Sequence, residues 1–372
     1  MKNIISIITI LFFCIVSLVV CRISNKIRNS KRKLDNMKYF KYNNSMNNHI
    51  SGDVMPLFSE ALGKNGIKSS GLEYANIIFF TLLTDYQKRK QILNNMPGVK
   101  YIYSLLSIDK MASKSNLVSV LASNLPTHVV ESILPVSFIL DNDEDMVKFK
   151  ESFTEEKLYI VKKNIQRQQG CVLTNNFKYI VDSPRNGFVV CQEVVKDVFT
   201  VNARKINLRI YLLVICKESP SMFIYNNGFV YYSKLPYDAN STNPDVHITT
   251  GYIDRRVYDE NPMTYLELKK TMKKKNVVKL DENIKKLISA VYNAYIPIIT
   301  KMDGSSKTNF TICGCDIAVD SKMNCKLMEI NKGPDLGSKD SRDRKVKYNL
   351  VLDTLIKVGI IDGVTNNFIN VC

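Results

Sequence analysis

The sequence predicts an α+β fold built on antiparallel sheets. Short apolar runs of strand length occur in adjacent pairs, and two pairs enclose a turn signal: Asn227-Gly228 lies within 223–232, and a polar turn separates 313–319 from 325–330. Longer amphipathic segments stand between and after these pairs, as in α+β proteins. With 372 residues, 45% hydrophobic and 23% charged, the chain can bury the cores of two or three structural units.

The first element is an apolar segment, Ile4–Cys21, of 18 residues without a charged side chain. As a helix at ~1.5 Å per residue it would be about 27 Å long, close to the roughly 30 Å of a bilayer's hydrocarbon core. No small-x-small cleavage site follows, so we expect a retained transmembrane anchor over 4–21 rather than a cleaved signal peptide. Six Lys and Arg residues follow it before Leu34, and only Lys2 precedes it. The positive-inside rule therefore predicts a single-pass membrane protein with the rest of the chain in the cytosol.

The next segments are a linker and a small domain. Residues 22–70 are basic, polar and rich in Asn, and we expect a flexible linker. An N-terminal α/β domain is predicted over 71–154. Its expected elements are a strand over 77–83, a helix over 86–96, a strand over 134–140, and a helix that begins after the cap residues Asp141-Asn142.

Two further units are expected, a central subdomain over 155–200 and a C-terminal subdomain over 201–372. Apolar runs of strand length mark both units, and the second also contains three amphipathic segments of helix length. The predicted strands are 157–162, 187–195, 207–216 and the two hairpins above, and the predicted helices are 262–275, 281–299 and 344–358.

The charge of the chain indicates an acidic partner, because 52 Lys and Arg against 35 Asp and Glu give a formal net charge of +17. No nucleic acid is expected, because the sequence lacks a recognition helix or a strand on which aromatic and basic residues alternate. Five lysines between 269 and 275 could dock an acidic protein tail, although such a run is usually a solvated helix face. The nine cysteines lack paired CxxC spacing, which favours reduced thiols.

The sharpest chemical signal comes from the second predicted hairpin. Glu329 and Asn331 are two residues apart on one strand and therefore share a face, and Asp316 lies on the partner strand. Two carboxylates and an amide oxygen are hard ligands that suit Mg²⁺ when phosphates complete its coordination. The alternative is the polar, solvent-facing side of an ordinary hairpin, and the spacing alone leaves both open.

A second signal is a polar row along a strand. Lys205, Asn207 and Arg209 alternate with apolar residues, so their side chains share one face of the strand. The alternative is the solvated face of an edge strand, which is the commoner case.

Two weaker signals suggest nucleotide recognition. Lys162 ends an apolar strand and is followed by a loop that contains Gly170, so its ammonium group could reach a phosphate. The polar pair Gln192-Glu193 interrupts another apolar strand, where backbone groups could meet the edge of an adenine.

In this order, the segments resemble the tubulin–tyrosine ligase-like family of ATP-grasp ligases, from about residue 74 to 358. The similar blocks are an Asn-x-x-Pro-Gly stretch with a following lysine, a lysine strand with a glycine loop, an adenine hinge, a Lys-Phe-Asp-x-Arg strand, a His-Leu-Thr-Asn segment, and an Asp strand with a Glu-x-Asn-x-x-Pro strand. In this chain they read NNMPG, YIVKKNIQRQQG, CQEVV, ARKINLRIYLLV, HITT and CGCDIAVD with LMEINKGPDL.

The resemblance implies an ATP-grasp architecture and an ATP-dependent carboxylate–amine ligase, whose catalytic part the charge pattern above places in the cytosol. Such a ligase adds an amino acid (glutamate, glycine or tyrosine) to a protein carboxylate through an acyl phosphate. The implied acceptor is an acidic tubulin-like tail, and the implied cofactors are ATP and Mg²⁺.

Residue roles follow from the same resemblance. Lys162 and the loop at Gly170 would hold the ATP phosphates, and Arg209 would contact the γ-phosphate or the acyl phosphate. His247 would line the catalytic site. The adenine and the rest of the nucleotide would meet Gln192, Glu193, Val194, Lys205 and Asn207, and Mg²⁺ would bind Asp316, Glu329 and Asn331.

Three positions depart from the family pattern. Asn207 replaces an Asp, Thr250 replaces the last Asn of the His-Leu-Thr-Asn segment, and Tyr231 replaces an Arg. The alternative hypothesis is therefore a degenerate member that binds nucleotide and acts as a membrane-tethered scaffold without ligase turnover.

Overall fold

The computed structural model describes most of the chain between residues 47 and 371. In this part of the chain no helix is long and apolar enough to cross a membrane. The predicted anchor over 4–21 and nearly all of the predicted helix over 86–96 lie outside the described residues, so both stay predictions. The described ranges are 47–50, 55–80, 95–96, 98–105, 108–165, 170–250, 253–302 and 307–371.

A mixed sheet forms the centre of the molecule, with ten strands in the described residues. Its longest strands, β10 (Arg204–Cys216), β11 (Pro220–Tyr232) and β12 (Thr308–Val319), are antiparallel, and β13 (Cys325–Lys332) returns beside β12. The predicted hairpin over 313–330 is confirmed by the β12–β13 pair. The short strands β9 (Thr200–Val201) and β14 (Phe368–Asn370) pair with β10 and β11.

The N-terminal strands extend this same sheet in parallel orientation. Strand β4 (Tyr101–Tyr103) pairs with β12, followed by β3 (Ile77–Phe79), β1 (Asn47–Ile50) and β2 (Lys68–Ser69). The region for which an α/β domain was expected thus adds parallel strands to a sheet whose longest strands are antiparallel. A short 3-10 helix, η1, spans Leu72–Tyr74.

Part of the predicted linker is folded. Helix α2 (Pro56–Lys64) begins with a proline in its first turn and buries four apolar residues, spaced so that they share one face. It packs against α13 (Ser341–Val358), the last helix of the chain. The side chains on its buried face are Leu57, Phe58, Ala61 and Leu62.

The predicted hairpin at Asn227-Gly228 was wrong, because both residues lie inside the continuous strand β11. A β-bulge interrupts the pairing with β10 here: Gly228 pairs with Ile210, whereas the next pair joins Leu212 to Ile224. A Cβ at position 228 would lie 2.1 Å from the Arg209 carbonyl oxygen, so the close backbone approach requires glycine. The Asn-Gly signal therefore marks a bulge rather than a turn.

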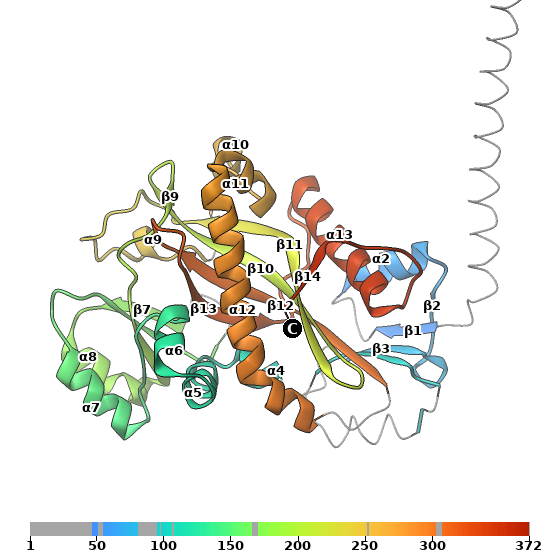
Figure 1. Ribbon diagram of the computed structural model, residues 1–372, viewed down its shortest axis with the longest axis horizontal. Coiled ribbons are helices and arrows are strands. Elements are labelled where there is room, and N and C mark those ends of the chain that lie inside the picture. The colour runs from blue at the N-terminus through green and yellow to red at the C-terminus, as the bar shows by residue number, and fades with distance from the viewer. Residues whose placement is uncertain are drawn as a thin grey trace, which may run out of the picture.

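Long helices cover the central sheet. Helix α12 (Lys274–Met302) packs against β11 and β13 and runs across the molecule in Figure 1. Its buried residues Leu280, Ile284, Leu287 and Ile288 follow helical spacing. Helix α12 starts earlier than the predicted helix 281–299 and takes in the end of the predicted helix 262–275. The shorter helices α9 (Pro244–His247), α10 (Val257–Glu260) and α11 (Tyr265–Thr271) precede it.

A smaller antiparallel sheet of four strands stands at the other end of the molecule from the N-terminal strands (Figure 1). Its strand order is β5–β8–β6–β7, and its own core includes Phe149 and Tyr159, both with no exposed surface. The strands are β5 (Ser137–Ile139), β6 (Tyr159–Lys163), β7 (Cys171–Thr174) and β8 (Phe188–Glu193). The helices of this region are α5 (Lys114–Asn124), α7 (Asp143–Ser152), α8 (Phe177–Asp182) and the 3-10 helix η3 (Ser183–Asn186). Helices α4 (Ile108–Ala112) and α6 (Thr127–Ile133) pack against β13 of the central sheet.

Candidate functional site

A cleft lies where the small sheet meets the central sheet. Residues of β6, β7 and β8 line it from one side, residues of β10, β12 and β13 from the other, and 247–250 complete it. The fold thus brings together segments that are up to about 170 positions apart in the sequence. The residues singled out in the sequence that line this cleft are Lys162, Glu193, Val194, Lys205, Asn207, His247, Thr250, Asp316 and Glu329.

Lys162, on β6, is held in place by a glutamine on the neighbouring strand. Its side chain is buried, and Nζ donates a hydrogen bond of 2.6 Å to Gln192 Oε1. Gln192 Nε2 in turn donates to Ser137 Oγ at 2.8 Å. The Gln192 side chain is thus engaged with Lys162, and the predicted hinge lines the cleft through Glu193 and Val194.

A second buried lysine shares the cleft. Lys205 is 5% exposed, and burial together with the nearby Lys162 ammonium group lowers its pKa to about 8. Burial likewise lowers the pKa of Lys162. Within the described chain neither ammonium group has a carboxylate within ion-pair distance. Two buried cations without counter-ions are costly, so an anion in this cleft would relieve an existing electrostatic strain.

Arg209 and Asp316 form a buried ion pair across β10 and β12. They are register partners, and Arg209 donates from Nε to Asp316 Oδ1 at 2.6 Å and from Nη2 to Oδ2 at 3.0 Å. Such two-pronged pairs are strong and directional. Gly314 provides the space, because a Cβ there would lie 2.9 Å from Arg209 Cδ.

Glu329 and Asn331 lie on one face of β13, beside Asp316. Asp316 and Glu329 are register partners, and Asn331 Nδ2 donates to Glu329 Oε1 at 3.0 Å. A β-bulge places Met328 as an extra residue next to this pair, and its carbonyl oxygen lies 3.5 Å from Lys162 Nζ. Bulges often occur beside functional sites, where they redirect a side chain.

Lys114 is a site residue that the sequence did not reveal. It is the first residue of α5 and is 9% exposed, and its Nζ lies 3.4 Å from Glu329 Oε2 and donates to the Ile165 carbonyl at 3.0 Å. Its backbone N–H donates to Asn164 Oδ1 at 2.8 Å. Lys114 thus links α5, the segment after β6 and strand β13. Lys110, four residues earlier in the sequence, is exposed instead.

The two carboxylates have different proton affinities. Burial raises the pKa of Asp316 to about 6, although Arg209 opposes this shift. Burial also acts to raise the pKa of Glu329, but Lys114, Asn331 and Lys162 outweigh it and lower the pKa to about 2. At neutral pH, Glu329 is therefore fully ionised and Asp316 is mostly ionised.

The donor set is consistent with Mg²⁺ that also binds phosphate. In the described residues no three His, Cys, Asp or Glu side chains gather as a metal site. Asp316, Glu329 and Asn331 supply two carboxylates and one amide, which leaves several positions of an octahedral Mg²⁺ for phosphate oxygens and water. Both carboxylates are paired with cations, Arg209 and Lys114, which a metal ion would replace in part.

Three buried polar atoms of the cleft have no hydrogen-bond partner within the described structure: Asn207 Oδ1, His247 Nδ1 and Thr249 Oγ1. His247 Nε2 lies 2.6 Å from the Ser241 carbonyl, to which it donates, so Nδ1 is left as an acceptor. Burial and the Lys205 charge help to lower the pKa of His247, although the Ser241 hydrogen bond opposes this, so the ring is neutral at pH 7. Buried polar groups are normally satisfied, and these atoms suit the hydroxyl groups of a ligand.

All three departures from the family pattern lie at this site: Asn207 and Thr250 line the cleft, and Tyr231 lies beside Asn207. Tyr231 pairs in register with Asn207, and its ring lies 5.2 Å from the Arg209 guanidinium carbon. Burial raises the pKa of Tyr231 to about 12, so the hydroxyl stays neutral. Tyr231 therefore stacks on Arg209 where the family pattern has a second cation.

Gly170 directly precedes β7, next to residues 166–169, which are outside the described structure. A Cβ at position 170 would lie 2.6 Å from Ile165 Cγ1, so the glycine allows the two ends of this loop to approach.

Comparison with known proteins agrees with this geometry. The sequence profile described as "Tubulin-tyrosine ligase family" matches residues 84–367, well over half of the chain. The α+β fold, with its antiparallel and mixed sheets, fits an ATP-grasp architecture. The chain belongs to the tubulin–tyrosine ligase family.

Curated relatives are identical to this chain at about a quarter of the aligned residues. Tubulin polyglutamylase ttll-4 of Caenorhabditis briggsae is 27% identical over 250 residues, which cover 61% of this chain and 40% of the relative. Tubulin polyglutamylase ttll6 of Danio rerio is 25% identical over 296 residues, or 73% and 36% of the two chains. The probable tubulin polyglutamylase TTLL9 of Rattus norvegicus is 26% identical over 172 residues, or 45% and 37%. The chain thus spans well under half the length of these relatives.

Proposed function

We propose that this protein is an ATP- and Mg²⁺-dependent ligase that adds an amino acid, with glutamate as the first candidate, to a carboxylate of an acidic tubulin-like tail. The observation that carries the proposal is the joint occurrence, in one cleft, of buried unpaired cations, two carboxylates and unpartnered acceptor atoms. The polyglutamylase relatives support glutamate as the donor and tubulin as the acceptor.

Each group of site residues would have a separate role in binding. Lys162 and Lys205 would hold the phosphates of ATP, because the attraction of both ammonium groups to an anion would offset the repulsion between them. Asn207, His247 and Thr249 would accept or donate hydrogen bonds to ligand hydroxyl groups. Asp316, Glu329 and Asn331 would hold Mg²⁺, which supplies charge neutralisation for phosphate oxygens when bound.

The reaction needs two displacements. An oxygen of the acceptor carboxylate attacks the γ-phosphorus and ADP leaves, which gives an acyl phosphate. The amine of the incoming amino acid then attacks the acyl carbon, phosphate leaves, and the nitrogen loses a proton to complete the amide. Arg209 and Lys114 would orient the anionic oxygens by fixed positive charge, which is most effective in a site that excludes water.

Mass spectrometry of tubulin tails tests the proposal. The full-length protein is incubated with tubulin, Mg·ATP and glutamate, glycine or tyrosine in separate reactions. We expect a mass gain for one amino acid, dependent on ATP, and no gain with the Asp316→Asn variant. The absence of any product under all three conditions, with intact Mg·ATP binding, would support the scaffold instead.

The scaffold remains the second candidate because of Tyr231 and Asn207. Tyr231 removes a cation, and Asn207 removes a negative charge beside the buried lysines. Both changes affect charge in the reaction more than they affect the binding of a nucleotide. Turnover of ATP in the presence of tubulin separates the two functions.

A further inference from the structure

Helix α12 presents a row of lysines outside the cleft. Lys275, Lys279 and Lys286 are exposed, and at about 100° per residue they lie within about 40° of one another around the helix axis. We name these three residues the lysine stripe. In the described part of the chain none of them has a carboxylate within 4 Å, although the exposed Glu282 lies on the same side of the helix.

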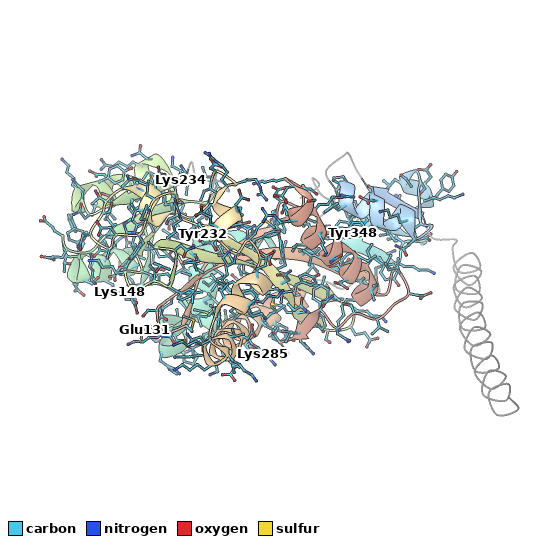
Figure 2. The ribbon with its side chains drawn as sticks, turned by 90° about the horizontal axis from the view of Figure 1, so that it is seen from above. Glu131, Lys148, Tyr232, Lys234, Lys285 and Tyr348 are labelled. Atoms are coloured by element: carbon cyan, nitrogen blue, oxygen red, sulfur yellow. The ribbon has the colours of Figure 1, made fainter. Side chains whose placement is uncertain are left out.

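Neighbouring side chains add to the positive charge of the stripe. Lys274 and Lys285 are exposed on its flank, and Figure 2 shows Lys285 at the surface of the molecule. Val278, which is 48% exposed, lies between them and offers an apolar contact. By contrast, Lys269 at the end of α11 is neutralised by Asp281, 3.3 Å away. Of the five lysines expected to dock an acidic tail, Lys269 is thus offset by an acid, whereas Lys275 belongs to the stripe.

The rest of the helix determines which partner fits. The apolar face of α12 is buried against the sheet, with Leu280 and Ile288 fully covered, so residues 274–299 of the helix offer no free apolar face to insert into a bilayer. The stripe also carries no aromatic side chain on which bases could stack. An acidic polypeptide needs only spaced cations along an extended path.

The dimensions of the stripe suit such a polypeptide. From Lys275 to Lys286 the helix rises about 16 Å, at ~1.5 Å per residue, which an extended peptide covers with about five residues. We propose that the lysine stripe docks an acidic tail of the substrate protein, and so acts as a second contact apart from the cleft. This inference rests on the proposed ligase function and names the surface that recruits its substrate.

Charge reversal tests the proposal against a matched control. The stripe variant combines Lys275→Glu, Lys279→Glu and Lys286→Glu, and the control combines Lys148→Glu, Lys150→Glu and Lys178→Glu on α7 and α8. Both change the net charge equally at exposed positions, and Lys148 and Lys285 lie well apart in Figure 2. The full chain is sedimented with stabilised microtubules, with microtubules whose acidic tails have been cleaved, and with phosphatidylserine vesicles.

We expect the stripe variant to bind intact microtubules about 10-fold more weakly, and the control less than 3-fold more weakly, at low salt. Cleavage of the tails should remove the difference between parent and stripe variant. Equal losses in both variants, unchanged binding in the stripe variant, or a stripe-dependent preference for vesicles over microtubules would overturn the proposal. A triple Lys→Gln stripe variant checks that the result does not depend on the new negative charges.

Mg·ATP affinity separates this inference from the proposed function. The substituted residues lie outside the cleft, so Mg·ATP binding should be the same in all variants. A parent that binds microtubules through the stripe but neither binds nor uses ATP would refute the ligase and leave the docking surface standing. If the parent ligates glutamate to microtubules, and the stripe variant and the control variant do so with equal efficiency, the docking surface is refuted and the ligase is not.

Discussion

Replacing Glu329 by Gln tests the electrostatics of the site directly. The Glu329 carboxylate lies 3.4 Å from Lys114 Nζ and accepts a hydrogen bond from Asn331. Burial acts to raise its pKa, but Lys114, Asn331 and Lys162 outweigh burial and hold the pKa at about 2, below the ordinary 4.5. The exchange to Gln changes the volume very little but removes the negative charge between two buried ammonium groups.

The expected magnitude follows from the pKa. A pKa lowered from 4.5 to about 2 favours the ionised carboxylate by about 3 kcal/mol, at about 1.4 kcal/mol per pKa unit. Because the folded-state pKa is the lower one, this stabilisation is complete above pH 4.5 and is lost as the pH falls towards 2. At pH 7 we therefore expect E329Q to lower the free energy of unfolding by up to about 3 kcal/mol.

Urea unfolding of four proteins measures this effect: the parent, Glu329→Gln, Lys114→Met and the double variant. In the Lys114→Met background the Glu329→Gln exchange should cost at least ~1 kcal/mol less, because its main counter-charge is gone. An equal cost in both backgrounds would refute the assigned ion pair. Mg·ATP affinity, measured in parallel, should fall strongly in every protein that lacks the carboxylate.

Three further predictions concern the same cleft. Gly314→Ala should displace the Arg209 side chain and reduce the free energy of unfolding by about 1–3 kcal/mol, as measured in thermal melts. The control is Gly63→Ala in α2, which should be neutral or stabilising because a Cβ there meets nothing within 4 Å. Tyr231→Arg should raise turnover more than ATP affinity, by about 1–3 kcal/mol in activation free energy; unchanged kcat in an active parent would argue against the need for a second cation. Mg·ATP affinity should decline below pH 6 as Asp316 gains its proton. The contribution of this carboxyl to folding stability should instead rise as the pH falls, because its pKa is higher in the folded than in the unfolded state. The Asp316→Asn variant should lack the step in affinity that this proton causes, and the same pH dependence in both proteins would exclude Asp316 as its source.

The sequence was sufficient to identify most residues of the cleft. Residues two apart on a strand share a face, so the grouping of Glu329 with Asn331, and of Lys205 with Asn207 and Arg209, needs only local periodicity. The long apolar strands and the polar turn between β12 and β13 likewise follow from local pattern. The family resemblance joined these local groups into one expected site.

Tertiary structure alone decided what each residue contacts. Lys114 reaches Glu329 over 215 positions of sequence, and no local pattern distinguishes it from the exposed Lys110. Sequence would predict a small effect on stability for Glu329→Gln, since the volumes match, and only the contact with Lys114 makes the expected effect large. The Asn-Gly pair of β11 is a hairpin signal locally, but the close approach of the Arg209 carbonyl to Gly228 makes it a bulge in a continuous strand. Local sequence determined the helices, the strands and their polar faces. The ion pairs and the protonation states of the site depend on residues that are distant in sequence, so only the packing of the folded chain determined them.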